Sequence, residues 1–395
     1  MNERINTPIS MAEMERRWTA IRAAMKEARV DVLVAQANND FVGGYVKYLT
    51  DMPATNGYHY TVIFPADGEI SAVAQGPFGQ DLHFDSLSAS PRRGVQRLLG
   101  CPSYASIHYS GTYDAECALQ ALEKFNGATI GLLAPGSISY AFVDYLKTHL
   151  SRSSFIDATS VVDPIKAIKS AEEIQLIRRM TALQDACADA VTKHLRPGLR
   201  DMEVVEIARA VATNMGSEQG WYMAASGPVG TAAVMQPPHL QNRVIEEGDQ
   251  FCMLIENSGP GGYYGEIGRT WVLGKASQDM KDEFAFVLEA QKFTLDLLIP
   301  GADPADIFAR YNDFMRKGGR PQENRLYAHG QGYDMVERPL IRQDETLKVA
   351  PNMLFAVHPT YVGDRTYNWV CDNWLVDGDG KVEALHKFPQ QITEL

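Results

Sequence analysis

The stretch from Gln250 to Gly274 reads QFCMLIENSGPGGYYGEIGRTWVLG, and it decides the fold. Its first part, up to Asn257, is mostly apolar. The next five residues, SGPGG at Ser258 to Gly262, have the composition of a tight turn. The last part, Tyr263 to Leu273, is rich in aromatic and β-branched residues, which favour strands. The pattern predicts two antiparallel strands joined at the turn.

Two glutamates occupy matching positions in this predicted hairpin. Glu256 and Glu266 lie symmetrically about Gly261, so a simple antiparallel register sets them side by side with Cβ atoms about 5 Å apart. Like charges at that distance repel unless a cation bridges them, a proton is shared or one pKa rises sharply. Each of these outcomes makes a functional site. A lone pair of this kind is more often a solvated hairpin in which the side chains splay apart.

Length and composition limit which classes of protein the chain can belong to. A chain of 395 residues predicts two domains or one large one. With 45% hydrophobic and 22% charged residues, wholesale disorder is excluded, and no apolar run is long enough to span a membrane. The first thirty residues hold acidic groups and no apolar signal core, which predicts a cytoplasmic protein.

Charge and cysteine content limit which binding partners are expected. The formal net charge is −12 and no basic tract is present, which argues against nucleic acid and anionic membranes. Five scattered cysteines do not form a disulfide pattern, so most are expected to be small buried residues. A small-molecule substrate is therefore the expected partner.

The first 160 residues predict an α/β domain without a phosphate-binding loop. A capping box at Ser10 and Glu13 opens a helix over Met11 to Arg29. Further helices are expected near Asp114 to Phe125 and Ile138 to Leu150, and strands at Asp31 to Gln36, Tyr60 to Pro65, Ile70 to Ala74, Ser106 to Tyr109 and Thr129 to Ala134. The aromatic stretch Asn38 to Tyr60 reads either as a loop packed on its own core or as a lid over a substrate site.

A boundary near Asp157 to Ser170 predicts a second domain over residues 161–395. Two helix pairs follow with the same pattern of caps and Pro-Gly breaks, which indicates an internal duplication. The expected helices are Ser170 to His194 with a capping box at Glu173, Met202 to Met215 capped by Asp201, a helix from Ser277 to Ile299, and Pro304 to Lys317 started by Asp303.

A second hairpin is expected to mirror the first. Strands at Met353 to His358 and Asn368 to Val376 flank the turn Gly363-Asp364. His358 and Cys371 lie symmetrically about that turn, as Glu256 and Glu266 do about theirs. Two equivalent hairpins would each present one pair of side chains to a shared pocket.

Five side chains with metal-coordinating atoms thus converge, four from the hairpins and one from a glycine-rich loop. They are Glu256, Glu266, His329, His358 and Cys371. Each alone is more often structural, since a single His or Cys is usually a core residue. Carboxylate, imidazole and thiolate together are a set that zinc, iron or manganese accepts, whereas the thiolate disfavours magnesium and calcium.

These residues resemble the creatinase/aminopeptidase P/prolidase superfamily, which has the pita-bread fold. The motifs that carry the resemblance are Gly248-Asp249, Gly262-Tyr263-Tyr264 with Arg269-Thr270, His329-Gly330-Gln331-Gly332, His358-Pro359 and Cys371-Asp372. The resemblance implies a creatinase-like amino-terminal domain over residues 1–160, a pita-bread catalytic domain over residues 161–395, and a homodimer. In the metallopeptidases of this superfamily, two Asp, one His and two Glu bind a dinuclear metal centre.

The chain departs from that pattern at four of the five ligand positions. Glu256 and Glu266 replace the two Asp, and His329 is kept. His358 and Cys371 replace the two Glu. All four replacements are ligand-capable, so the resemblance implies a rewritten site with one zinc, iron or manganese ion, or a metal-free site as in creatinase.

Two further positions bear on the reaction. Where the peptidases carry a second His before a Glu, this chain has Val336 before Glu337, which disfavours the peptidase proton transfer. His239, in Pro237-Pro238-His239, is similar to the catalytic His of creatinase, although a loop His near a turn is the plainer interpretation.

The resemblance predicts a hydrolase that acts on a small non-peptide molecule at a C–N bond, as creatinase and ectoine hydrolase do. The expected catalytic residues are His239, Glu256, Glu266 and His329, with substrate contacts from Tyr58, Trp221 and Tyr264. The aromatic residues are equally compatible with plain core packing. Three alternatives stay open: a metal-dependent Xaa-Pro dipeptidase or aminopeptidase, a small-molecule lyase on the same fold, and an inactive binding module.

Overall fold

The computed structural model describes residues 6–395 of the chain. The chain divides into two compact units, Met1–Lys166 and Ala167–Leu395. Both units combine helices with β-sheets, which confirms the predicted α/β class. Within residues 6–395, no helix has the length and apolar character that crossing a bilayer requires.

The amino-terminal unit is built on a mixed seven-stranded sheet in the order β4-β5-β3-β2-β1-β6-β7. Its strands are β1 Val32–Ala37, β2 Tyr60–Pro65, β3 Ile70–Gln75, β4 Gln80–His83, β5 Val95–Cys101, β6 Thr129–Leu133 and β7 Ser154–Asp157. Its helices are α1 Met11–Ala28, α2 Gly44–Thr50, α3 Tyr113–Leu122, α4 Tyr140–His149 and α5 Thr159–Ala167, with short 3₁₀ turns η1 His108–Ser110, η2 Glu123–Phe125 and η3 Pro135–Ser137. Helices α3 and α4 bury Leu122 and Phe142 against this sheet.

Two sequence predictions in this unit are wrong. The expected strand Ser106 to Tyr109 is a turn that ends in η1, because the Ser110 hydroxyl bonds the carbonyls of Tyr104 and Ile107. The stretch Asn38 to Tyr60 contains α2, which the sequence did not indicate. Its N-cap is Gly43, which makes no side-chain cap bond, so no cap signal announces the helix.

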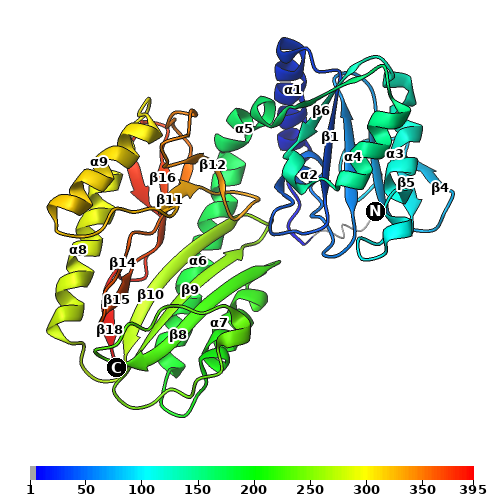
Figure 1. Cartoon of the computed structure of the whole chain (residues 1–395). Helices are drawn as coiled ribbons and strands as arrows, with labels where there is room; N and C mark the ends of the chain where they lie inside the picture. Colours follow the sequence, from blue (N-terminus) through cyan, green and yellow to red (C-terminus); the bar gives the residue numbers. More distant parts are fainter. Residues whose placement is uncertain (1–5) are drawn as a thin grey trace. The chain divides into compact units, whose positions relative to one another are not determined.

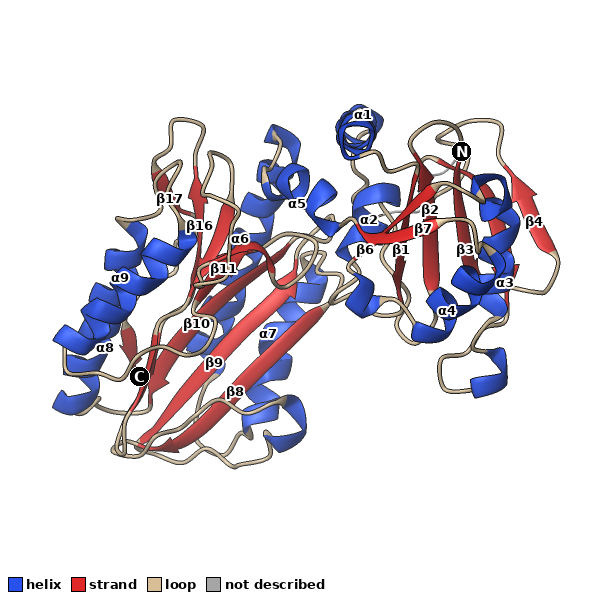
Figure 2. Ribbon diagram, turned by 45° about the horizontal axis from the view of Figure 1, so that its top comes forward, coloured by secondary structure: helices blue, strands red, loops and turns tan. Residues whose placement is uncertain are grey.

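The carboxy-terminal unit repeats one arrangement, a helix pair packed on a sheet (Figures 1 and 2). Helices α6 Ala171–His194 and α7 Asp201–Asn214 cover the sheet β18-β10-β9-β8. Helices α8 Gln278–Leu295 and α9 Pro304–Lys317 cover the sheet β12-β11-β13-β16-β17. This repetition matches the predicted internal duplication. The strands are β8 Gly220–Pro228, β9 Asp249–Ser258, β10 Tyr264–Val272, β11 Ala328–Gly330, β12 Glu337–Leu340, β13 Leu354–Val357, β14 Thr360–Val362, β15 Tyr367–Trp369, β16 Asp372–Val376, β17 Val382–Ala384 and β18 Ile392–Glu394, with the 3₁₀ turn η4 Pro238–Leu240 after β8.

Helix caps in this unit follow the sequence closely. Ser170 and Glu173 form the expected capping box at the start of α6. Ser277 caps α8 and Asp303 caps α9. Helix α7 differs by one residue, since Asp201 is its first helical residue and the cap position belongs to Arg200.

The predicted first hairpin is present. Strands β9 and β10 pair antiparallel from Gln250 with Val272 to Ser258 with Tyr264. The turn between them carries Gly261 and Gly262 at φ of 85° and 86°, a conformation that only glycine adopts at little cost. The glycines of the SGPGG sequence therefore lie where the turn requires positive φ angles.

The second hairpin is broken into two shorter pairs. Strand β13 pairs with β16, and β14 pairs with β15 in a separate two-stranded sheet. Val357 opposes Asp372 and Thr360 opposes Trp369, and this common register sets His358 opposite Cys371. The symmetry read from the sequence therefore holds, although the two long strands do not.

We expect Gly268→Ala to destabilise the carboxy-terminal unit. A Cβ at position 268 would overlap the indole nitrogen of Trp369, so the ring or the strand must shift. Overpacking of this kind costs about 1–3 kcal/mol, and more where the neighbour is buried as Trp369 is. Thermal denaturation followed by circular dichroism measures the change. The control is Gly378→Ala, where a new Cβ meets nothing within 4 Å. Equal melting temperatures for the two variants would contradict the expectation.

Candidate functional site

A row of three side chains crosses the sheet β8-β9-β10. Trp221 on β8 opposes Glu256 on β9, and Glu256 opposes Glu266 on β10. Directly paired residues point to the same face of a sheet. The opposite face carries apolar residues such as Ile255 and Ile267, which are buried against α6 and α7. The row therefore faces away from these helices.

Glu266, His329 and His358 form one cluster. The Oε1 atom of Glu266 lies 3.4 Å from Nε2 of His329 and 3.6 Å from Nε2 of His358. One ligand atom from each of the three residues lies within 4.8 Å of the other two. His329 is supplied by β11, and His358 directly follows β13. Two sheets thus contribute to one site.

The two imidazoles are held in place by different contacts. Nδ1 of His329 lies 2.9 Å from the carbonyl oxygen of Gly330, and because a carbonyl oxygen only accepts, Nδ1 donates this bond and Nε2 is the atom turned to Glu266. The ring of His358 stacks on Trp369 with centroids 5.6 Å apart. Burial lowers the pKa of His358 to about 4, so this imidazole is neutral near pH 7.

The paired glutamates differ in charge. Burial and the nearby Glu266 carboxylate raise the pKa of Glu256 well above its ordinary value. Burial also acts to raise the pKa of Glu266, but the neighbouring His358, His329 and Cys371 together hold it below its ordinary value. The two carboxyl groups are therefore inequivalent, and a proton held between them favours Glu256 over Glu266.

Cys371 adjoins this cluster as a thiol. Its Sγ donates to the backbone carbonyl of Glu266 at 3.7 Å. Burial and the charges of Glu266 and Asp372 raise its pKa well above the ordinary value. The predicted set of five ligands is thus divided into three residues with converging ligand atoms and two neighbours, Glu256 and Cys371.

The two sheets are joined directly beneath the cluster. The amide of Gly268 donates to the carbonyl of Cys371 at 3.0 Å. Next to them, the fully buried Arg269 makes a bidentate ion pair with Asp372, with N–O distances of 2.6 and 3.2 Å. Asn373 accepts the backbone N–H of Glu266 through Oδ1 at 2.8 Å. These bonds fix the position of Glu266 relative to β16.

The remaining predicted residues lie outside the cluster. Tyr264 is buried, and its backbone N–H donates to the carbonyl of Gly332 at 2.7 Å. His239 lies exposed on η4. Tyr58 belongs to the amino-terminal unit and is 38% exposed. Val336, where the peptidases carry a His, is 46% exposed.

The sequence reasoning missed Trp369 and Asn373. Trp369 contacts His358, and Asn373 bonds both Glu266 and Gln331. Asn373 stands two residues after Cys371 and therefore has the same side-chain direction along the strand, which is the signal that would have indicated it.

The family model for metallopeptidase family M24 matches residues 175–382, just over half of the chain. The chain belongs to the metallopeptidase family M24. This M24 chain is thus a member of the creatinase/aminopeptidase P/prolidase superfamily that the motifs predicted.

Relatives agree with this assignment. The chain is 27% identical over 239 residues to a protein named probable dipeptidase PepE from Mycobacterium bovis, and the match covers 60% of this chain and 62% of that protein. It is 26% identical to an uncharacterized hydrolase/peptidase, y4tL, from Sinorhizobium fredii over 96% of both chains. The crystal structure of an X-Pro aminopeptidase from Thermotoga maritima superposes with a TM-score of 0.78 at 16% identity, covering 97% of this chain and 99% of that one. The pita-bread fold is thereby confirmed.

The residues of this M24 chain fit one metal ion better than two. Oε1 of Glu266 is buried without a hydrogen-bond partner in residues 6–395, and Nε2 of His329 and Nε2 of His358 lie 3.4 and 3.6 Å from it. Three ligand atoms this close together favour a divalent cation, and two imidazoles with one carboxylate suit zinc, iron or manganese. A second ion would need ligands from Glu256 and Cys371, which do not belong to the group of three whose ligand atoms converge.

We expect Arg269→Met to cost about 3–5 kcal/mol of folding free energy, because it leaves the carboxylate of Asp372 buried without its partner. Urea denaturation measures the loss. Arg178→Met is the matched control, since it breaks the exposed pair with Glu383, which contributes about 0–1 kcal/mol. A similar loss in both variants would show that the buried pair does not hold the two sheets together.

Proposed function

We propose that this M24 chain hydrolyses a C–N bond in a small non-peptide molecule. The observation that carries the proposal is the pair Glu256 and Glu266, held in register beside Trp221 with their pKa values shifted in opposite directions. A protonated carboxyl next to an ionised one supplies an acid and a negative charge at one place.

Each carboxylate has a separate role in this proposal. The protonated Glu256 donates its proton to the nitrogen as the C–N bond breaks, so that the amine leaves neutral while water supplies the hydroxyl bound to carbon. The ionised Glu266, with His329 and His358, would hold a divalent ion, which lowers the pKa of a bound water. Without an ion, Glu266 serves as base or nucleophile, or holds a protonated substrate nitrogen.

The proposed substrate pocket is apolar on one side. Trp221 stands next to Glu256 in the same row, and Tyr264 precedes Glu266 by two residues and so points to the same face. Aromatic walls suit a compact substrate with one polar end. His239 stays a candidate for proton transfer, and Tyr58 stays a candidate for a substrate contact.

The names of relatives favour a second candidate, a dipeptidase or Xaa-Pro peptidase. These names are the most direct support for any substrate class. Against this candidate, the ligand set departs from the dinuclear pattern, and Val336 occupies the position of the second peptidase His. These two departures support the proposed non-peptide substrate.

We expect purified protein to turn over small cyclic amides, amidines or guanidino compounds, and Ala-Pro or Gly-Pro dipeptides far more slowly. Parallel assays that detect released amine decide between the two candidates. Ordinary enzymatic rates on the dipeptides would favour the peptidase. Incorporation of ¹⁸O from labelled water separates a hydrolase from a lyase, and no turnover of any compound would indicate a binding module.

We expect Glu256→Gln to lower kcat by about 10²–10⁴-fold, since the amide keeps the shape but has no carboxyl proton to donate. The fold should not change, and circular dichroism checks this. Glu247→Gln alters an exposed glutamate of the same unit and should leave kcat as it is. An active Glu256→Gln enzyme would remove Glu256 from the acid role.

We expect about one equivalent of zinc, iron or manganese per chain. His329→Ala should lose the ion, because it removes one of three ligands, whereas His194→Ala changes an exposed helix residue and should keep it. Elemental analysis of dialysed protein measures the content. Two equivalents would indicate a dinuclear centre. Far less than one equivalent, with activity indifferent to chelators, would establish the metal-free alternative.

The homodimer and the cytoplasmic location stay proposals. Size-exclusion chromatography with light scattering tests the first, and a monomer at micromolar concentration would contradict it.

A further inference from the structure

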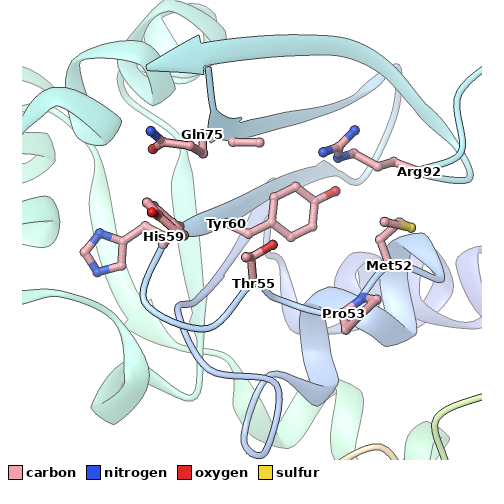
Figure 3. Close-up of a pocket in the computed structure, with 9 residues that line it drawn as sticks. Met52, Pro53, Thr55, His59, Tyr60, Gln75 and Arg92 are labelled. Atoms are coloured by element: carbon pink, nitrogen blue, oxygen red, sulfur yellow. The ribbon is translucent and has the colours of Figure 1, made fainter. Parts of the chain in front are cut away.

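The amino-terminal unit contains a cavity of about 170 Å³, and of its lining residues only Tyr58 is also a candidate for the proposed function. It lies where the end of α2 meets the first residue of β2, the last residues of β3 and the segment before β5. Figure 3 shows the side chains around it. They are Met52, Pro53, Thr55, Tyr58, His59, Tyr60, Ala74, Gln75 and Arg92.

Arg92 brings an unmatched positive charge to this cavity. It is half-buried, and within residues 6–395 its guanidinium forms no ion pair with a carboxylate. The guanidinium lies 5.6 Å from the centre of the Tyr60 ring. The next residue behaves differently, since Nε of Arg93 lies 3.4 Å from a carboxylate oxygen of Asp51. Arg93 thus has a counter-charge and Arg92 has none, and an anionic ligand would supply the charge that Arg92 lacks.

Tyr60 brings an unused donor. Its side chain is 5% exposed, and its hydroxyl lies beside Thr50 and Arg92 but makes no hydrogen bond of full geometry within the described residues. Figure 3 shows this hydroxyl directed to the same side as the Arg92 guanidinium. A buried hydroxyl left without a partner costs free energy unless a bound molecule accepts its hydrogen bond.

The lining contains no acidic residue. His59 does not change this balance, because its Nδ1 lies 3.4 Å from Asp114 and its Nε2 lies 3.5 Å from the Asn38 amide. Gln75 is directed to the rim, where its amide donates to the Tyr104 hydroxyl at 3.4 Å. The polar groups left for a ligand are thus one cation and the hydroxyls of Thr55, Tyr58 and Tyr60, a set of donors without a carboxylate, which selects an anion.

We propose that this cavity is a binding site for a small molecule with one carboxylate. Arg92 and the Tyr60 hydroxyl bind the two oxygens, and Met52, Pro53 and Ala74 contact a short apolar chain. A single guanidinium matches the one charge of a carboxylate, and its parallel N–H groups match the planar pair of oxygens. A phosphate with up to two charges would call for a second cation, which the lining lacks.

The proposed carboxylate site does not depend on the proposed function. All nine lining residues belong to the amino-terminal unit, whereas Glu266, His329 and His358 belong to the carboxy-terminal unit. Binding can therefore be measured in a protein whose metal cluster has been disabled.

The experiment titrates the full chain with n-butyrate and follows binding by ligand-observed NMR, with n-butylamine and inorganic phosphate as comparison probes. Butyrate should bind, and butylamine should not. Arg92→Gln should weaken butyrate binding at least about tenfold, since it removes a charge-assisted pair of hydrogen bonds. Tyr60→Phe should weaken it less. Arg152→Gln, an exposed arginine of the same unit, and His329→Ala should bind butyrate as the wild type does.

Arg92→Lys provides a second variant in case Arg92→Gln does not fold. It keeps the charge without the planar fork, so an intermediate affinity is expected. The proposal is overturned if the wild type does not bind butyrate, if it binds phosphate more tightly, or if Arg92→Gln binds butyrate unchanged. Loss of binding in His329→Ala would also overturn it, because butyrate would then occupy the metal cluster instead.

Discussion

The buried ion pair between Arg269 and Asp372 is the interaction on which the candidate site depends. Taking both charges out of water is costly, and only a close bidentate geometry with further hydrogen bonds offsets that cost. Arg269 meets this condition, since it also donates to the carbonyls of Cys371, Phe388 and Pro389. The pair thereby links strand β10 to β16 and to the carboxy-terminal segment, and it sets the two halves of the unit in one register.

That register determines the electrostatics of the site. Burial acts to raise the pKa of Glu266, but His358, His329 and Cys371 hold it below its ordinary value. Glu256, one strand further away, has no such neighbours, and burial with the nearby Glu266 raises its pKa. Two identical side chains thus differ in acidity because only one of them lies at the junction of the sheets.

Much of this could be predicted from the sequence, because the decisive features are local. Caps such as Ser170 and Asp303, and the glycine turn at Gly261, fix backbone geometry within a few residues. The pairing of Glu256 with Glu266 follows from counting outward from that turn.

Features that depend on distant contacts could not be found in this way. The stacking of Trp369 on His358 and the exclusion of Cys371 from the ligand cluster arise from how two sheets meet, which no single stretch encodes. Helix α2 was not predicted for another reason: its N-cap residue is Gly43, which has no side chain to indicate a cap. The resemblance to a family supplied the long-range arrangement that the local patterns lacked.

The contact between Gly268 and Trp369 has a consequence for how such a chain can change over generations. The indole occupies the space that any side chain at position 268 would need. A larger residue at position 268 therefore fits only after Trp369 has been replaced by a smaller residue. The substitution at 369 must come before the one at 268. Since the same ring also stacks on His358, a change at His358 is tied to a glycine on the opposite sheet.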